Sequence, residues 1–171
     1  VVDTPGHAAH HVSFFCGDNL FLGESAGTFS SLNGPSDSLD CYLRPATPPR
    51  FFPEVADRSL LAMLEAGPLP GRLCFAHHGM FTGDAKALLM HARQQLQLWV
   101  AVVGETLGIA EVKATDKAAV QQLIPEIIKQ LNLADHFYAR GKELPQDIRQ
   151  REEDFTRQTL MGIIGYLAGC L

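Results

Sequence analysis

Two short apolar segments near the beginning of the sequence, VSFFC and LFLGES, flank the turn residues Gly17, Asp18 and Asn19. Aromatic and aliphatic segments on either side of such a turn predict a β-hairpin. The segment VVDTPG just before them is β-branched and ends at Pro-Gly, which predicts another short strand. The chain therefore begins with strands.

Helical patterns follow after residue 52. Pro53 stands at the favoured first position of a helix that Gly67 ends, and the next segment, RLCFA, predicts a short buried strand. Asp84 is placed to cap a long helix. The apolar residues of that helix recur at helical spacing: Ala85, Leu88, Leu89, Ala92, Leu96, Trp99 and Val103.

The last third of the sequence is predicted to be helical as well. The helical pattern resumes after Thr115, is interrupted at Pro125 and returns from about Arg151 to the end. Strands paired early and helices placed late predict an α/β fold. A chain of 171 residues is long enough for one domain with its own core, so residues 1–171 are predicted to form a single domain.

The composition of the stretch 25–52 differs from that of the predicted strands before it and of the predicted helices after it. It holds Ser, Gly and Asn and then RPATPPRFFP, whose prolines favour an extended backbone and exclude a helix. We expect a long loop here. A loop of that length inside a compact domain is usually functional or disordered.

Charge and cysteine content exclude several classes of protein. The net charge is −5 and the 14 Lys and Arg residues are scattered, which argues against a nucleic-acid partner. Four cysteines stand far apart, which disfavours both a thiolate zinc site and a disulfide framework: Cys16, Cys41, Cys74 and Cys170. Free buried thiols indicate a reducing compartment, so we expect a cytoplasmic protein.

The apolar tail LMGIIGYLAGCL is too short to cross a bilayer, which needs about 20 residues. It contains Gly165 and Gly169 at G-x-x-x-G spacing, and we expect a buried terminal helix that packs closely through its glycines. No membrane partner is therefore predicted.

Three side chains with metal-binding chemistry stand at predicted strand ends, each close to a glycine. His7 follows Pro-Gly, Glu24 follows Gly23, and His77 follows RLCFA. Imidazole and carboxylate groups are the ligands of zinc, iron and manganese sites. Any one of these histidines taken alone would more often be an ordinary polar residue, but three such strand ends together favour a metal site.

Of each of two histidine pairs, at most one side chain is expected to face the same metal. His10 and His11 are adjacent, as are His77 and His78, and successive strand side chains point to opposite faces. His11 and His78 are therefore expected beside the ligands, with His11 donating to Glu24 or packing under the turn. The remaining histidines are expected at the surface: His10, His91 and His136.

The segments TPGHAAHHVSFF, LFLGESAG and CFAHHG resemble consecutive landmarks of the metallo-β-lactamase-fold hydrolases, near the glyoxalase II-like branch. Their order and intervals agree with that family along essentially the whole chain. The resemblance implies the C-terminal half of a four-layer αββα sandwich. One mixed sheet would carry the ligand loops, with helices on its outer face.

The sequence departs from the family pattern at two points. The signature H-x-H-x-D-H, which lies upstream in the family, is absent, so the chain resembles the C-terminal half of a longer protein. Glu24 stands where the family has Asp, which keeps the carboxylate on a longer stem. The catalytic residues are expected in the missing upstream half.

The resemblance implies a metal-dependent hydrolase whose water is activated by two divalent cations, zinc by expectation, with iron or manganese as alternatives. It places His7 on one cation, His77 on the other and Glu24 between them. The substrate would be a small thioester, lactone or similar ester. The loop at 25–52, with Phe29 and Tyr42, would form a wall of the substrate site, or else a solvated loop.

Two other classes remain open. One is a di-iron oxidoreductase on the same fold, because carboxylate-rich sites suit iron, and the other is a non-catalytic fragment. The chain by itself is expected to be inactive, since it holds only part of a two-metal site. Apolar strand surface left uncovered would favour a homo-oligomer or aggregation.

Overall fold

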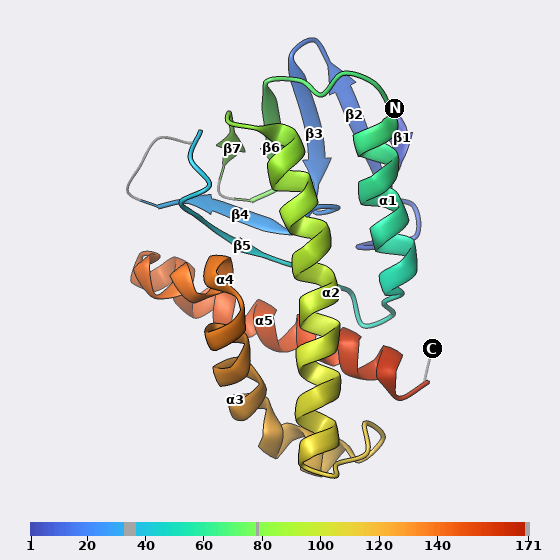
Figure 1. The fold of residues 1–171 in the computed structure, drawn as a ribbon, viewed down its shortest axis with the longest axis vertical. Helices are drawn as coiled ribbons and strands as arrows, with labels where there is room; N and C mark the ends of the chain where they lie inside the picture. The colour runs from blue at the N-terminus through green and yellow to red at the C-terminus, as the bar shows by residue number, and fades with distance from the viewer. Residues whose placement is uncertain (33–36, 78, 170–171) are drawn as a thin grey trace.

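The computed structural model describes residues 1–171 except 33–36, 78 and 170–171. A sheet with two helices occupies one end of the molecule, and a group of helices occupies the other (Figure 1). The strands are β1 (Val2–Asp3), β2 (Val12–Cys16), β3 (Asn19–Gly23), β4 (Thr28–Ser31), β5 (Cys41–Arg44), β6 (Arg72–Phe75) and β7 (Met80–Phe81). The helices are α1 (Pro53–Glu65), α2 (Ala85–Ile109), α3 (Lys117–Ala134), α4 (His136–Ala139), the 3₁₀ helix η1 (Arg140–Glu143) and α5 (Gln146–Leu167).

The main sheet has five strands in the order β1-β2-β3-β6-β7. The predicted hairpin is present as β2 and β3, which pair antiparallel. β6 runs parallel to β3, so the sheet is mixed, as the sequence predicts. This parallel pair sets Gly23 opposite Phe75 and brings the ends of both strands to one edge of the sheet.

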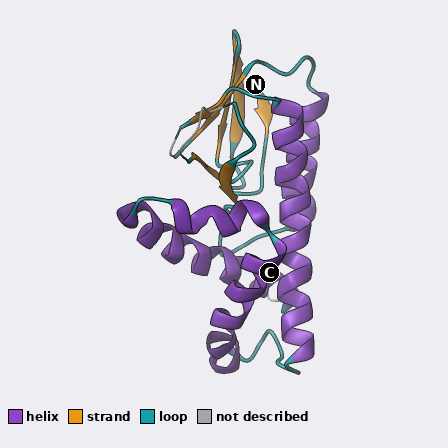
Figure 2. Cartoon of the chain, turned by 60° about the vertical axis from the view of Figure 1, so that its left-hand side comes forward, coloured by secondary structure: helices purple, strands orange, loops and turns teal. Residues whose placement is uncertain are grey.

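Helices cover one face of this sheet. Figure 2 shows the sheet nearly edge on, with the long helices along one side. Leu20, Leu22 and Leu73 point toward them and are fully buried in a core that includes Leu60 of α1 and Leu89 of α2. The predicted α/β class, with helices on one face of a mixed sheet, is therefore confirmed.

The opposite face of the sheet carries a row of apolar side chains. Phe14 pairs with Phe21, Phe21 with Cys74, and Cys74 with Met80, so the row crosses four strands. The exposed fractions are 47% for Phe14, 46% for Phe21 and 38% for Met80. In the sandwich predicted from the sequence, a second sheet packs against this row.

The stretch 25–52 is not the long loop expected from its composition. Its described residues include β4 and β5, which pair antiparallel from Thr28 opposite Arg44 to Ser31 opposite Cys41. The prolines of the RPATPPRFFP segment, Pro45, Pro48, Pro49 and Pro53, come after β5, so they do not remove a hydrogen bond from this hairpin. No helix forms in the described part of the stretch, in agreement with the prediction.

Helix starts predicted from local signals are confirmed. α1 begins at Pro53 and ends just before Gly67, which has a φ of 133°. The carboxylate of Asp84 accepts a hydrogen bond from the backbone N–H of Ala87 and caps α2.

The predicted interruption at Pro125 is wrong, because α3 continues through it. A proline inside a helix costs about 3 kcal/mol. Ile124, Ile127 and Leu131 of the same helix are buried in the second core, and this packing offsets the cost. α5 also begins earlier than predicted, at Gln146 rather than near Arg151.

The C-terminal helix packs closely, as expected, but mainly through an earlier glycine. A Cβ on Gly162 would lie 2.3 Å from the carbonyl oxygen of Pro48, whereas one on Gly165 would lie 3.6 Å from that of Pro49. Gly169 lies beyond the end of α5, with a φ of 64°. Among the described residues, none of the helices has the length and apolar content needed to cross a membrane.

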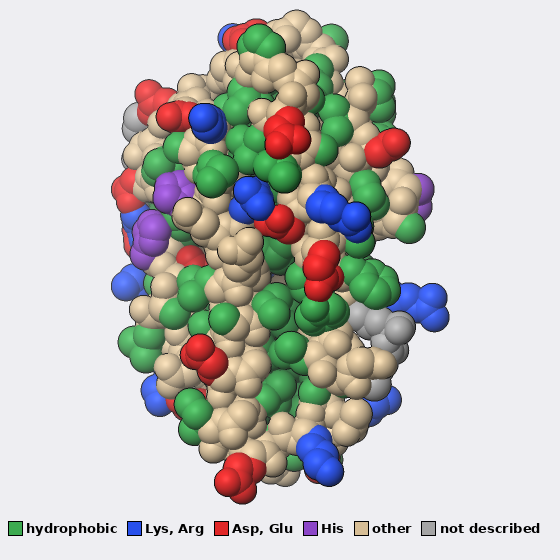
Figure 3. Space-filling model, turned by 45° about the vertical axis from the view of Figure 1, so that its right-hand side comes forward, with side chains coloured by type: hydrophobic (Ala, Val, Ile, Leu, Met, Phe, Trp, Pro, Cys, Tyr) green, Lys and Arg blue, Asp and Glu red, His purple; other side chains and the backbone are tan. Residues whose placement is uncertain are grey.

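Charged side chains are mixed on the surface. On the face drawn in Figure 3, basic and acidic groups alternate and are separated by apolar and neutral side chains. This face shows no continuous basic patch of the kind that binds a nucleic-acid backbone.

Candidate functional site

The three predicted ligands come together at one edge of the sheet. His7 lies in the turn after β1, Glu24 directly follows β3, and His77 follows β6. The Nε2 atom of His7 lies 2.9 Å from Glu24 Oε2. The Nε2 atom of His77 lies 3.5 Å from Glu24 Oε1. Each oxygen of the carboxylate therefore faces one imidazole nitrogen.

The sheet itself explains this convergence. The backbone N–H of Ala76 donates to the carbonyl of Gly23 at 2.9 Å, which continues the parallel pairing past the strand ends. Glu24 and His77 thus leave neighbouring strands at the same level. The side chains remain partly open to solvent, with exposed fractions of 31% for His7, 27% for Glu24 and 50% for His77.

His7 is held in a defined orientation. Its Nδ1 lies 3.1 Å from the carbonyl oxygen of Ala46 and donates to it, so Nε2 is the nitrogen that faces Glu24. The hydrogen bond to Glu24 raises the pKa of His7. The same hydrogen bond lowers the pKa of Glu24. The two groups therefore favour an imidazolium–carboxylate pair.

His11 supports the turn that carries Glu24. Its Nε2 accepts a hydrogen bond from the backbone N–H of Glu24 at 3.3 Å. Its Nδ1, 2.8 Å from Thr4 Oγ1, is therefore the protonated nitrogen and donates to that hydroxyl. Burial lowers the pKa of His11. Of the two roles expected for this residue, packing under the turn is observed, and donation to the Glu24 carboxylate is not.

Gly23 makes this arrangement possible. Its φ is 58°, in the left-handed region that favours glycine. A Cβ at this position would lie 2.4 Å from His11 Nε2. The glycine beside Glu24 is thus required both for the backbone turn and for the close approach of the imidazole.

Arg44 is a site neighbour that the sequence analysis missed. It is 2% exposed and lines a small cleft of about 90 Å³ together with His7, Glu24 and His77. Its guanidinium donates to Glu152 Oε2 at 2.8 Å. This partner is 108 positions away along the chain, so no local signal in the sequence identifies the pair.

The far wall of this cleft is formed by α5. Phe155, Gln158 and Thr159 line it opposite His7 and His77. Thr159 Oγ1 also accepts from Arg44 Nη1 at 2.8 Å, which links the helix to β5. Sequence periodicity predicts a helix here but does not say which cleft its side chains enter.

The two residues expected in a wall of the substrate site are buried in β4 and β5. Phe29 is fully buried and stacks on Phe75, with ring centroids 5.1 Å apart, so it is a core residue. Tyr42 is 1% exposed and its hydroxyl donates to Glu152 at 3.0 Å. Both lie in β-strands that turn these side chains inward. The predicted role of His78 falls outside the described residues.

The donor atoms suit a transition-metal cation, but the described residues bring together only three donor groups, which is too few for two cations. Two imidazole Nε2 atoms and one carboxylate are ligands that zinc, iron and manganese accept. In the part of the chain that the structure describes, no group of three or more His, Cys, Asp or Glu residues is arranged to hold a metal ion by itself. Zinc sites require three or four protein ligands.

No protein-family model matches the chain. Among curated proteins, it is 34% identical over 96 residues to a metallo-β-lactamase fold-containing protein of Sulfurisphaera tokodaii. The match covers 56% of this chain and 32% of the relative, so the chain spans about a third of the relative's length.

A similar solved structure is the crystal structure of an archaeal metallo-β-lactamase superfamily protein from Sulfolobus tokodaii. Its sequence identity to this chain is 31%, its TM-score is 0.41, and the match covers 54% of this chain and 31% of that one. Over the part of its length that the sequence match covers, the chain is similar to a metallo-β-lactamase fold-containing protein, and its strand-end motifs resemble those of the same fold family.

Proposed function

We propose that this chain is part of a metal-dependent hydrolase that cleaves a small thioester, lactone or similar ester. One observation carries the proposal: both oxygens of Glu24 face an imidazole Nε2, at 2.9 Å for His7 and 3.5 Å for His77. A carboxylate between two imidazoles is a donor set for two neighbouring cations. The sequence relationship to a metallo-β-lactamase-fold protein supports the same chemistry.

Each of the three converging residues would have its own role in binding the cations. His7 would hold one cation and His77 the other, with Glu24 between the two. Two such cations, when bound, make water acidic enough to supply hydroxide at neutral pH and polarise the carbonyl that is attacked. Further ligands would come from a segment upstream of His7.

The other residues of this chain would keep the donors in place. The carbonyl of Ala46 holds Nδ1 of His7, which leaves Nε2 for the cation. The imidazole of His11 fixes the backbone of Glu24. Phe155 and Gln158 of α5 close the opposite side of the cleft and would exclude water from one side of the substrate.

The test compares this chain with a longer chain that carries the upstream segment. We expect the longer chain to hold about two metal ions and to hydrolyse thioester or lactone substrates, and the 171-residue chain to hold fewer ions and to be inactive. Glu24→Gln and His77→Ala should each remove metal and activity from the longer chain. Glu24→Asp is the matched control, because it keeps the carboxylate.

Metal analysis also separates the alternatives. Zinc with ester turnover supports the proposal, whereas iron with oxygen consumption and no ester turnover would favour the oxidoreductase. A longer chain that neither binds metal nor turns over an ester would reject both enzymes and favour a binding protein.

A further inference from the structure

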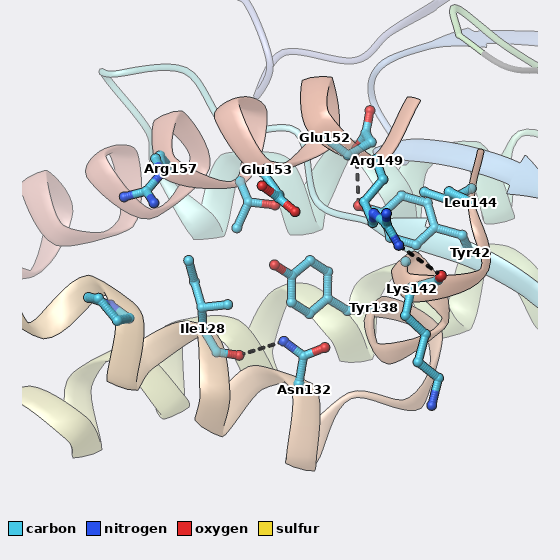
Figure 4. A pocket seen from close by; sticks show the side chains of 13 residues that line it. Tyr42, Ile128, Asn132, Tyr138, Lys142, Leu144, Arg149, Glu152, Glu153 and Arg157 are labelled. Carbon is cyan, nitrogen blue, oxygen red and sulfur yellow. Dashed lines mark hydrogen bonds between the residues drawn. The ribbon is translucent and has the colours of Figure 1, made fainter. Parts of the chain in front are cut away.

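A second and larger cavity lies among α3, α4, η1 and α5 (Figure 4). Its volume is about 410 Å³, compared with about 90 Å³ for the cleft at His7 and Glu24. Pockets for small organic molecules span about 300–1,000 Å³. The described residues that line it do not include His7, Glu24 or His77, so the cavity is separate from the candidate metal site.

The floor of this cavity is apolar and packed against the core. Tyr138 lies at its centre and is only 8% exposed. Its ring packs edge to face against buried Trp99, with centroids 4.9 Å apart. Ile128 and Leu144 add aliphatic surface on either side (Figure 4). An apolar body placed here would be removed from water without any rearrangement of the core.

The rim of the cavity carries an excess of positive charge. Three basic side chains line it, Lys142, Arg149 and Arg157, against two acidic ones, Glu152 and Glu153. The carboxylate of Glu152 is matched by buried Arg44, whose Nε lies 2.8 Å from it. Three cations and the remaining carboxylate leave two positive charges, although the whole chain has a net charge of −5.

These cations are available to a ligand. Among the described residues, no salt bridge involves Lys142, Arg149 or Arg157. Arg149 Nη1 donates only a long hydrogen bond, 3.4 Å, to the backbone carbonyl of Lys142. Figure 4 shows Lys142 and Arg149 at the same end of the cavity, with Ile128 and Tyr138 beyond them.

We propose that this cavity binds a small carboxylic acid with an apolar body. The carboxylate would lie between Lys142 and Arg149, and the apolar body would lie over Tyr138 and Ile128. A guanidinium and an ammonium from two different elements select a carboxylate over a neutral group. The apolar floor selects a chain or ring over a simple anion.

Octanoate is a suitable probe, because it combines a carboxylate with an apolar chain. Acetate lacks the chain and octan-1-ol lacks the charge. Binding to the 171-residue chain is measured by calorimetry and by the fluorescence of its one tryptophan, Trp99, which contacts Tyr138. We expect octanoate to bind one per chain and at least about tenfold more tightly than acetate or octan-1-ol.

The double substitution Lys142→Gln and Arg149→Gln should weaken octanoate binding about tenfold, because two exposed charge contacts are lost. The matched control removes the same two charges from α1 and α2, with Arg58→Gln and Lys86→Gln, and should stay within about twofold of the original chain. Ile128→Trp, which fills the cavity, should abolish binding.

Three results would overturn the proposal. They are octan-1-ol binding as tightly as octanoate, the Lys142 and Arg149 double variant binding octanoate as the original chain does, and undiminished binding to a folded Ile128→Trp chain. If Ile128→Trp fails to fold by circular dichroism, the double variant decides. None of these measurements requires metal or turnover, so they test the binding of a carboxylic acid independently of the proposed hydrolase function.

Discussion

Two ion pairs close to the candidate site lie in opposite surroundings. At the sheet edge, His7 and Glu24 form a pair that is about a third exposed, beside a sheet whose second face is open. Between β5 and α5, Arg44 and Glu152 form a pair that is almost fully buried, with exposed fractions of 2% and 4%. The first pair is accessible to a ligand and the second is enclosed by packing.

The difference in burial indicates that the Arg44–Glu152 pair stabilises the fold and that the His7–Glu24 pair is available for chemistry. Arg44 donates hydrogen bonds to Glu152, to Thr159 and to the carbonyl of Pro45, so it joins β5 to α5 in the interior. A buried pair of this kind holds elements in place, because removal of one partner leaves a charge without compensation. The open pair at the sheet edge contributes little to stability and keeps its donors free for another partner.

The largest expected loss of stability comes from a substitution in the buried pair of Arg44 and Glu152. Arg44→Leu should destabilise the chain by about 3–5 kcal/mol, because the Glu152 carboxylate remains buried without its cation. Chemical denaturation followed by circular dichroism measures this loss. His7→Leu, the matched change at the open pair, should cost about 1 kcal/mol or less.

A double variant sharpens the comparison. Arg44→Leu combined with Glu152→Leu should recover much of the lost stability, since no charge is then left buried alone. If Arg44→Leu by itself costs under about 1 kcal/mol, the two pairs are equivalent and the comparison fails.

An intermediate loss of folding stability is expected where α5 packs against Pro48 and Pro49. Gly162→Ala should destabilise by about 1–3 kcal/mol, because its Cβ would lie 2.3 Å from the Pro48 carbonyl oxygen. Gly165→Ala is the control in the same helix, where the nearest contact is 3.6 Å. It should be neutral or stabilise by up to about 1 kcal/mol through helix propensity. Equal thermal midpoints for the two variants would contradict the close packing of α5.

The smallest change in stability is expected on the open face of the sheet. Phe21→Thr keeps a residue that favours strands and should change the free energy of unfolding by about 0.5 kcal/mol or less. It should nevertheless reduce self-association, because it interrupts the exposed row of Phe14, Phe21 and Met80. Sedimentation velocity measures the fraction of dimer. Unchanged association in this variant would place the contact between copies elsewhere.

Local sequence signals were enough to predict much of the candidate site. His7, Glu24 and His77 stand at strand ends beside glycines, and hydrogen bonding between neighbouring strands then brings such ends together. The helix starts at Pro53 and after Asp84 were predictable for the same reason, since a fixed φ and a capping carboxylate act within a few residues.

Tertiary structure decided everything that depends on distant partners. Phe29 and Tyr42 were predicted to face a substrate, but strands β4 and β5 turn them into the interior. α3 continues through Pro125 because packing in the helical core outweighs a local preference. Arg44 finds Glu152 108 residues away, and a contact of that range leaves no trace in local composition or spacing. The sequence alone therefore determined which groups reach the sheet edge, and only the folded chain determined what surrounds them.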